Sequence, residues 1–211
     1  EKFEKNNNKK FDTRTRFEIY NDLKKEDESI SLRVSPFNFL YKKNTNIFPL
    51  SGVSNSNTIN CNENGYYSMY QSDRFGFNNP DLEWDNDLIE YVIVGDSFAI
   101  GECVNAPHDI ASILRNLSKK SVINLGYSGN GPLLEYASLR EYLPNNAKKI
   151  IWLYYEGNDL EGVLEEISNN ILSKYIKNKK FTQNLKDKQS IIDQEANKLI
   201  NEEFKKNHEK K

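Results

Sequence analysis

Histidine, methionine and cysteine are scarce in this chain, whose 211 residues include two histidines, one methionine and two cysteines. Neither histidine has partners at the spacing of the common metal-binding motifs, so the sequence predicts no metal site, and it predicts no other cofactor. Two cysteines are too few for a disulfide framework. We expect Cys61 and Cys103 to be small, unpaired core residues; the alternative is one disulfide in an oxidising envelope compartment.

Long apolar runs are also missing. No run approaches the roughly 20 residues that span a bilayer, and no signal-peptide pattern is visible. The sequence begins at Glu1 rather than at a methionine. We therefore leave an upstream signal or membrane anchor open, and we favour a bacterial envelope or periplasmic location over the cytoplasm.

The chain has little excess charge of either sign. Its net charge is −2, and 28% of its residues are charged. Mean hydropathy is −0.78 and the isoelectric point is about 5.9. This balance gives no electrostatic reason to expect a nucleic-acid partner.

A chain of 211 residues has room for one core of ~100 to 150 residues, which is a usual size for a single domain. We expect this core to be incomplete and to carry appendages. We expect four stretches. A charged N-terminal arm covers residues 1–44, and an irregular lead-in with some strand character covers 45–88. An α/β core follows at 89–176, and a charged helical segment ends the chain at 177–211.

The most informative run is an apolar strand, residues 91–94, that breaks at a Gly-Asp-Ser turn. Open α/β sheets bind ligands in the crevice beyond the carboxyl ends of their strands. Ser97 stands at such an end, and we take it as the candidate nucleophile. Asp96 beside it is expected to bond backbone amides in the turn.

Two more strand-to-helix units follow. After Pro107, Ile110, Ile113, Leu114 and Leu117 have helical spacing and predict one buried stripe. A strand at 121–125 then leads through a glycine-rich turn into a helix over 132–144, and a third strand is predicted at 149–155. Consecutive β-to-α junctions imply parallel strands, whose loops gather at one end of the sheet. Ser97, Gly129 and Asn158 can then face one pocket.

Three short blocks carry a family resemblance: Gly-Asp-Ser-Phe at 95–98, Asn-Leu-Gly-Tyr-Ser-Gly at 124–129, and Gly-Asn-Asp at 157–159. In order and spacing they resemble the first three blocks of the SGNH (GDSL-like) hydrolases. The resemblance covers about residues 90–160. It implies a flavodoxin-like three-layer α/β/α sandwich with a parallel central sheet, here incomplete, and hydrolysis or transfer of an ester-linked acyl group.

The resemblance also implies roles for the candidate residues. Ser97 would be the nucleophile, and its own N–H one oxyanion donor. The Gly129 N–H would be the second donor, with Gly126 as a competitor for that role, and the side-chain amide of Asn158 would be the third. Losing one such donor typically slows a reaction by ~100- to 1000-fold. Asp159 is expected to cap a helix.

The fourth block of that family, Asp-x-x-His, is missing. Only His108 and His208 occur, His108 is too close in sequence to Ser97 to match the family's base, and Lys205 stands where the aspartate before His208 would be. We favour truncation over a degenerate site, so the chain as given is expected to be inactive. The alternative is a noncatalytic carbohydrate-binding or assembly module that keeps the pocket without the base.

The substrate expectation comes from a segment upstream. The octet at 73–80 resembles one that precedes the serine strand in some bacterial SGNH-like proteins linked to surface polysaccharides. The expected partner is therefore a small-molecule or polysaccharide acyl ester. Arg74 is a candidate for holding a substrate carboxylate. Its structural alternative is a turn formed by Asp73 and Arg74 and pinned by aromatic packing.

Two helical patterns follow Asp159. Apolar residues recur every four positions from Val163 to Tyr175 and predict one amphipathic helix. After a charged break at 178–188, a weaker helix is expected over 192–204, with an apolar face left exposed.

Overall fold

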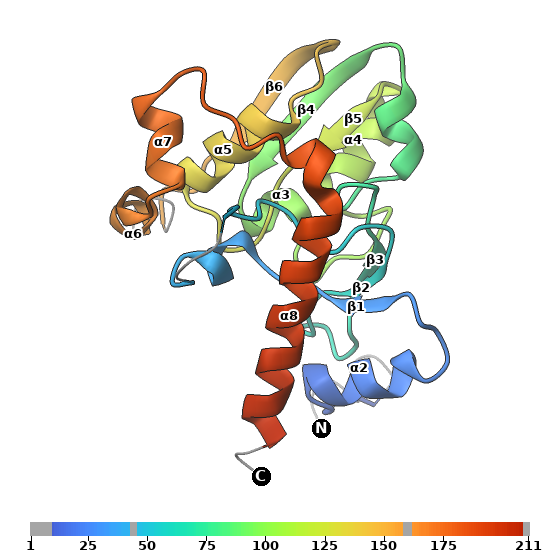
Figure 1. The fold of residues 1–211 in the computed structure, drawn as a ribbon. Coiled ribbons are helices and arrows are strands. Elements are labelled where there is room, and N and C mark those ends of the chain that lie inside the picture. The colour runs from blue at the N-terminus through green and yellow to red at the C-terminus, as the bar shows by residue number, and fades with distance from the viewer. Residues whose placement is uncertain (1–9, 43–45, 158–161, 209–211) are drawn as a thin grey trace.

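In the computed structural model, the described residues are 10–42, 46–157 and 162–208 (Figure 1). They contain two small sheets. The first has the order β1-β2-β3, with β1 (Ile30–Leu32) parallel to β2 (Asn57–Ile59) and β2 antiparallel to β3 (Met69–Gln71). The second carries the predicted parallel strands.

That second sheet has the order β5-β4-β6, and both of its ladders are parallel. Its strands are β4 (Ile89–Gly95), β5 (Val122–Asn124) and β6 (Ala147–Leu153). Strand β4 is central, and its Tyr91 pairs with Val122 on one side and Lys149 on the other. The predicted α/β class and the parallel strands are confirmed.

Helices lie on both faces of this sheet. Alternate residues of a strand point to opposite faces. Val92 and Val94 of β4 join the main core with α5 (Pro132–Tyr142), whereas Ile93 joins a second cluster with Ala111 of α4 (Ile110–Ser118). Proline opens α5, as predicted.

The prediction of a buried stripe on α4 is wrong. Ile110, Ile113 and Leu117 are exposed, and only Leu114 of that set is partly buried against the sheet. Ala111 is the fully buried residue of this helix, because its small side chain lets α4 approach the strands closely.

The stretch expected as a charged arm contains regular structure. Helix α2 (Arg16–Lys24) begins at Thr15 with a capping box that Glu18 completes. It is followed by β1 and by η1 (Pro36–Phe39). Leu32 and Phe39 are buried in the main core, so this segment packs as part of the same body.

The segment after residue 161 also differs from its prediction. Two short helices, α6 (Val163–Ser168) and α7 (Leu172–Lys177), replace the single amphipathic helix, because the Asn169 side chain accepts hydrogen bonds from the amides of Ile171 and Leu172 and starts a new turn. After η3 (Leu185–Lys188) comes the long helix α8 (Gln189–His208), whose Phe204 packs against Phe17 of α2 with ring centroids 4.5 Å apart.

The expected weak terminal helix is confirmed, but the exposed apolar face is wrong. Ile192, Ala196, Leu199 and Ile200 of α8 are buried in the main core. No helix in the described ranges has the length and apolar content that a membrane crossing requires.

The expectation of two unpaired cysteines is wrong as well. Cys61 and Cys103 form a disulfide, with their Cα atoms 5.1 Å apart. The two cysteines are 42 positions apart in sequence, and no local sequence pattern links them. Only the fold brings them together. The bond joins the loop after β2 to the loop after α3 (Ser97–Ile100).

Removing this bond is expected to lower the free energy of unfolding by about 4 kcal/mol, since a cross-link over 42 positions restricts the unfolded chain. Urea unfolding of the Cys61→Ala, Cys103→Ala double variant, compared with the wild-type chain, measures the difference. Adding reductant should destabilise the wild-type chain and leave the double variant unchanged. An equal response of both chains would contradict the pairing.

Candidate functional site

The candidate serine stands where the central strand turns into a helix. Strand β4 ends at Gly95, and Asp96 caps α3 by accepting the Phe98 amide at 3.0 Å. The expected role of Asp96 in the turn is confirmed. Gly95 has φ +155°, and a Cβ there would lie 2.8 Å from the Leu153 carbonyl oxygen, so the turn requires glycine.

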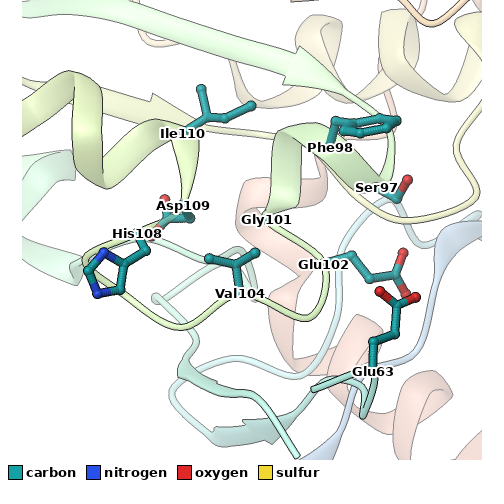
Figure 2. A pocket seen from close by; sticks show the side chains of 9 residues that line it. All are labelled: Glu63, Ser97, Phe98, Gly101, Glu102, Val104, His108, Asp109 and Ile110. Carbon is teal, nitrogen blue, oxygen red and sulfur yellow. The ribbon is translucent and has the colours of Figure 1, made fainter. Parts of the chain in front are cut away.

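The Ser97 hydroxyl opens onto a cavity of about 360 Å³ (Figure 2). Its hydrogen-bond contact is with the Asp96 carboxylate, at 3.4 Å, a long distance for a hydroxyl donor. The neighbouring backbone N–H, that of Ser97 itself, opens helix α3, where amides lack intrahelical acceptors. Ser97 therefore stands at the N-terminus of this four-residue helix.

Two glutamates face the same cavity. Figure 2 shows the carboxylates of Glu63 and Glu102 pointing toward one another, below Ser97. Arg33 pairs with Glu102 at 2.5 Å. Each glutamate is close in sequence to a bonded cysteine, so the disulfide between Cys61 and Cys103 brings both glutamates to the cavity that Ser97 lines.

His108 does not contact the candidate serine. It lines the opposite end of the cavity, and its ring points away from Ser97 (Figure 2). The adjacent Asp109 caps α4 by accepting the Ser112 amide at 2.9 Å, which fixes where His108 leaves the chain.

The Gly129 loop is tied to the end of β4. Asn124 donates to the Ala99 carbonyl at 2.6 Å, and its side-chain oxygen accepts the Gly126 amide at 2.9 Å. The Tyr127 amide donates to the Gly95 carbonyl at 3.1 Å. Gly129 has φ +76°, a conformation that favours glycine. These bonds hold the second block of the resemblance beside the serine turn.

Gly129 lines a second cavity, of about 310 Å³, with Phe37, Tyr41 and Glu165 among its walls. Glu166 is buried there and accepts the amides of Gly131 at 2.8 Å and Leu133 at 2.9 Å. The N-terminus of α5 is thus already occupied by a carboxylate and is closed to a bound anion.

The described residues therefore place Ser97 and Gly129 on two cavities. The third candidate, Asn158, lies outside the described residues, as does Asp159. The convergence of all three loops stays a prediction, supported so far by the shared end of the parallel strands.

Arg74 is held by two carboxylates. Its guanidinium contacts Asp81 at 2.8 Å and Asp85 at 2.7 Å, and these bonds lower the pKa of both aspartates. The 3-10 helix η2 (Asp81–Asp85) carries both partners. These ion pairs give Arg74 a structural role that the sequence did not predict, and its role in holding a substrate carboxylate stays a prediction.

The preceding Asp73 organises that turn. Its buried carboxylate accepts the amides of Phe75 and Phe77, the Asn79 side chain and the Trp84 indole, at 2.8 to 2.9 Å. Phe75 and Trp84 pack edge to face with ring centroids 4.8 Å apart. The predicted turn, pinned by aromatic packing, is present.

Sequence reasoning missed Glu63 and Glu102. Each lies within two positions of a cysteine, but this closeness points to the site only if the two cysteines are known to form a disulfide. Among the residues with described placement, no group of three or more His, Cys, Asp or Glu side chains could hold a metal ion.

No protein-family model matches the chain, and neither the curated proteins nor the solved structures compared with it gave a match.

The Asp73 carboxyl is expected to make stability fall as pH rises. Burial raises its pKa from 3.8 to about 6, so the folded state keeps a proton that the unfolded state releases above pH 4. Between pH 4 and 7 this group should remove up to about 3 kcal/mol from the free energy of unfolding. Urea unfolding across that range, for wild type and Asp73→Asn, isolates the effect.

The difference in free energy of unfolding between the two chains should shrink as pH rises, because only the wild-type chain titrates at position 73. Parallel pH profiles would show that the four donors keep Asp73 ionised throughout.

Proposed function

We propose that this chain carries the nucleophile and oxyanion donors of an SGNH-type serine esterase or O-acyltransferase. The observation that carries the proposal is the position of Ser97, at the N-terminus of a helix directly after the central strand of a parallel sheet. Acyl transfer needs such a hydroxyl beside backbone N–H donors.

The strand order supports the same proposal. The strands lie in the spatial order β5-β4-β6. Counted along the chain, this is the second strand, then the first, then the third. A flavodoxin-like sheet begins with this order and binds its ligand where the order reverses, between its first and third strands. We propose that the sheet is part of such a three-layer sandwich. Ser97 follows β4, the first of these strands.

In the proposed reaction, the Ser97 oxygen forms a bond to the ester carbonyl carbon and loses its proton to a base. The carbonyl oxygen becomes an oxyanion, held by the N–H groups of Ser97 and Gly129 and by the Asn158 amide. Collapse expels the alcohol and leaves an acyl-serine, which water or a second hydroxyl then cleaves. The substrate class, an acyl ester of a carbohydrate or envelope polysaccharide, comes from the resemblance.

The base is the part of the reaction that the described residues do not supply to Ser97. Its hydroxyl contacts Asp96, and His108 points elsewhere. The same observation favours the second candidate function, a noncatalytic carbohydrate-binding or assembly module. The two functions differ in whether Ser97 can be acylated once an imidazole is present.

Added imidazole is expected to act as the base that the described residues do not supply to Ser97. The chain is incubated with p-nitrophenyl acetate with and without imidazole, and acetylated positions are mapped by mass spectrometry. Acetylation of Ser97 should rise with imidazole concentration, because the free base can remove the hydroxyl proton. The variant Asn158→Ala should acylate about 100-fold more slowly, through loss of one oxyanion donor.

Ser97→Ala is the negative control, and Ser168→Ala, an exposed helical serine on α6, is the matched variant that should behave as wild type. If imidazole leaves Ser97 unmodified while surface groups acetylate, the enzyme proposal fails and the binding module is favoured.

A further inference from the structure

Residues 127–130 form a β-turn between β5 and α5. The Asn130 amide donates to the Tyr127 carbonyl at 3.2 Å and closes the turn. Its third residue, Gly129, has φ +76°, whereas the second residue, Ser128, has a negative φ. A turn with a positive φ at its third residue alone is of type II, and glycine adopts that conformation without strain. The 127–130 turn is therefore a type II turn.

The middle peptide of this turn joins Ser128 to Gly129. Its carbonyl oxygen belongs to Ser128, and its N–H belongs to Gly129. Type I and type II turns share their end positions and differ in this peptide, which is rotated by roughly 180° between them. Because glycine tolerates both types, the residues of the turn alone leave the direction of the Gly129 N–H open.

A serine from the N-terminal segment fixes the middle peptide. The Ser35 hydroxyl donates to the Ser128 carbonyl oxygen. The same hydroxyl oxygen accepts the Phe37 amide at 3.3 Å at the start of η1, so its proton is available for the carbonyl. Ser128 is buried, and rotating its carbonyl away from Ser35 would break a buried hydrogen bond. The Ser35 hydroxyl therefore favours the type II turn.

The other end of the same peptide is open. The peptide is trans, so its N–H points in the opposite direction to its carbonyl and away from η1. Gly129 is exposed on its cavity of about 310 Å³, and its N–H donates to no acceptor within the described part of the chain. The bond from the Tyr127 amide to the Gly95 carbonyl keeps the turn beside Ser97.

We propose that Ser35 is a positioning residue for the oxyanion site. Its hydroxyl holds the turn in type II and thereby keeps the Gly129 N–H directed at the carbonyl oxygen of an ester bound at Ser97. A hydrogen bond to the carbonyl also polarises the peptide and strengthens its N–H as a donor. Ser35 has this role only if Gly129 is an oxyanion donor, as the proposed function holds.

The segment that carries Ser35 is itself anchored. Two residues earlier, Arg33 pairs with Glu102 at 2.5 Å, and the side chains of both partners are largely buried. The Ser35 hydroxyl oxygen lies 3.5 Å from the position that a Cβ on Gly129 would occupy, so the segment packs directly against the turn. The stretch 1–44, expected to be a charged arm, thereby supports the site without touching the substrate.

Acylation of Ser97 by p-nitrophenyl acetate in the presence of imidazole measures this role. Ser35→Ala should acylate about tenfold more slowly than wild type, because the buried Ser128 carbonyl loses its donor and the turn no longer favours type II. Ser35→Thr keeps a hydroxyl and should restore most of the rate. Asn38→Ala is the matched control. It removes the other bond of the η1 capping box and leaves the Ser35 hydroxyl in place, so it should acylate as wild type does.

The amide proton–nitrogen NMR signal of Gly129 reports on the peptide without any acylation. In Ser35→Ala this signal should leave its wild-type position, because the amide nitrogen senses both the bond to the Ser128 carbonyl and the direction of the peptide. In Ser35→Thr and Asn38→Ala it should stay close to the wild-type position.

Equal acylation of Ser97 in wild type and Ser35→Ala overturns the role of Ser35, as does an equal loss of rate in Asn38→Ala. A Gly129 signal that Ser35→Ala leaves in place, or that Ser35→Thr moves as far, overturns it as well. If imidazole leaves Ser97 of the wild-type chain unmodified, the proposed function fails and the positioning role fails with it, even where the Gly129 signal shows that Ser35 holds the turn.

Discussion

Strand β4 bonds in parallel to β5 on one edge and to β6 on the other, and the positions of Ser97 and Gly129 follow from this double pairing. Parallel neighbours end on the same side, so the turns after all three strands emerge together. Ser97 follows the central strand β4. Gly129 follows β5, and its loop is held to the end of β4 by the hydrogen bond from the Tyr127 amide to the Gly95 carbonyl. Reversing any one strand would move its loop to the far side of the sheet.

A buried polar network joins the lead-in segment to this sheet. Asn79 donates to both Asp73 and the Asn124 carbonyl, at 2.9 Å each, and accepts from the Asn124 amide at 2.8 Å. Arg115 of α4 donates to the same Asn79 side-chain oxygen at 2.8 Å. One asparagine therefore fixes the 73–79 turn, the second strand and the covering helix relative to each other, since an unpaired buried amide would be costly.

The elements whose formation depends on neighbouring residues were predicted correctly. The three strands were visible as apolar runs, and Pro132 and Asp96 were placed correctly because helix starts depend on neighbouring residues. The errors came from long-range packing. Periodicity could not show that the small Ala111 would face the sheet in place of Ile113, nor that Cys103 would meet a cysteine from the loop after β2. At the site, sequence found the serine turn, but the glutamates beside it depend on that disulfide.

Carboxylates lie around Ser97, and in the proposed reaction they would affect how its hydroxyl loses a proton. Asp96 contacts the hydroxyl, Glu63 and Glu102 face the same cavity, and Arg33 pairs with Glu102. Negative charge near a hydroxyl disfavours its ionised form, so Ser97 should stay protonated by itself. The same field favours a cation that forms beside the serine, as an imidazolium does when it takes the proton. In the proposed reaction, these carboxylates would therefore favour direct proton transfer from Ser97 to a neutral imidazole over formation of a free alkoxide.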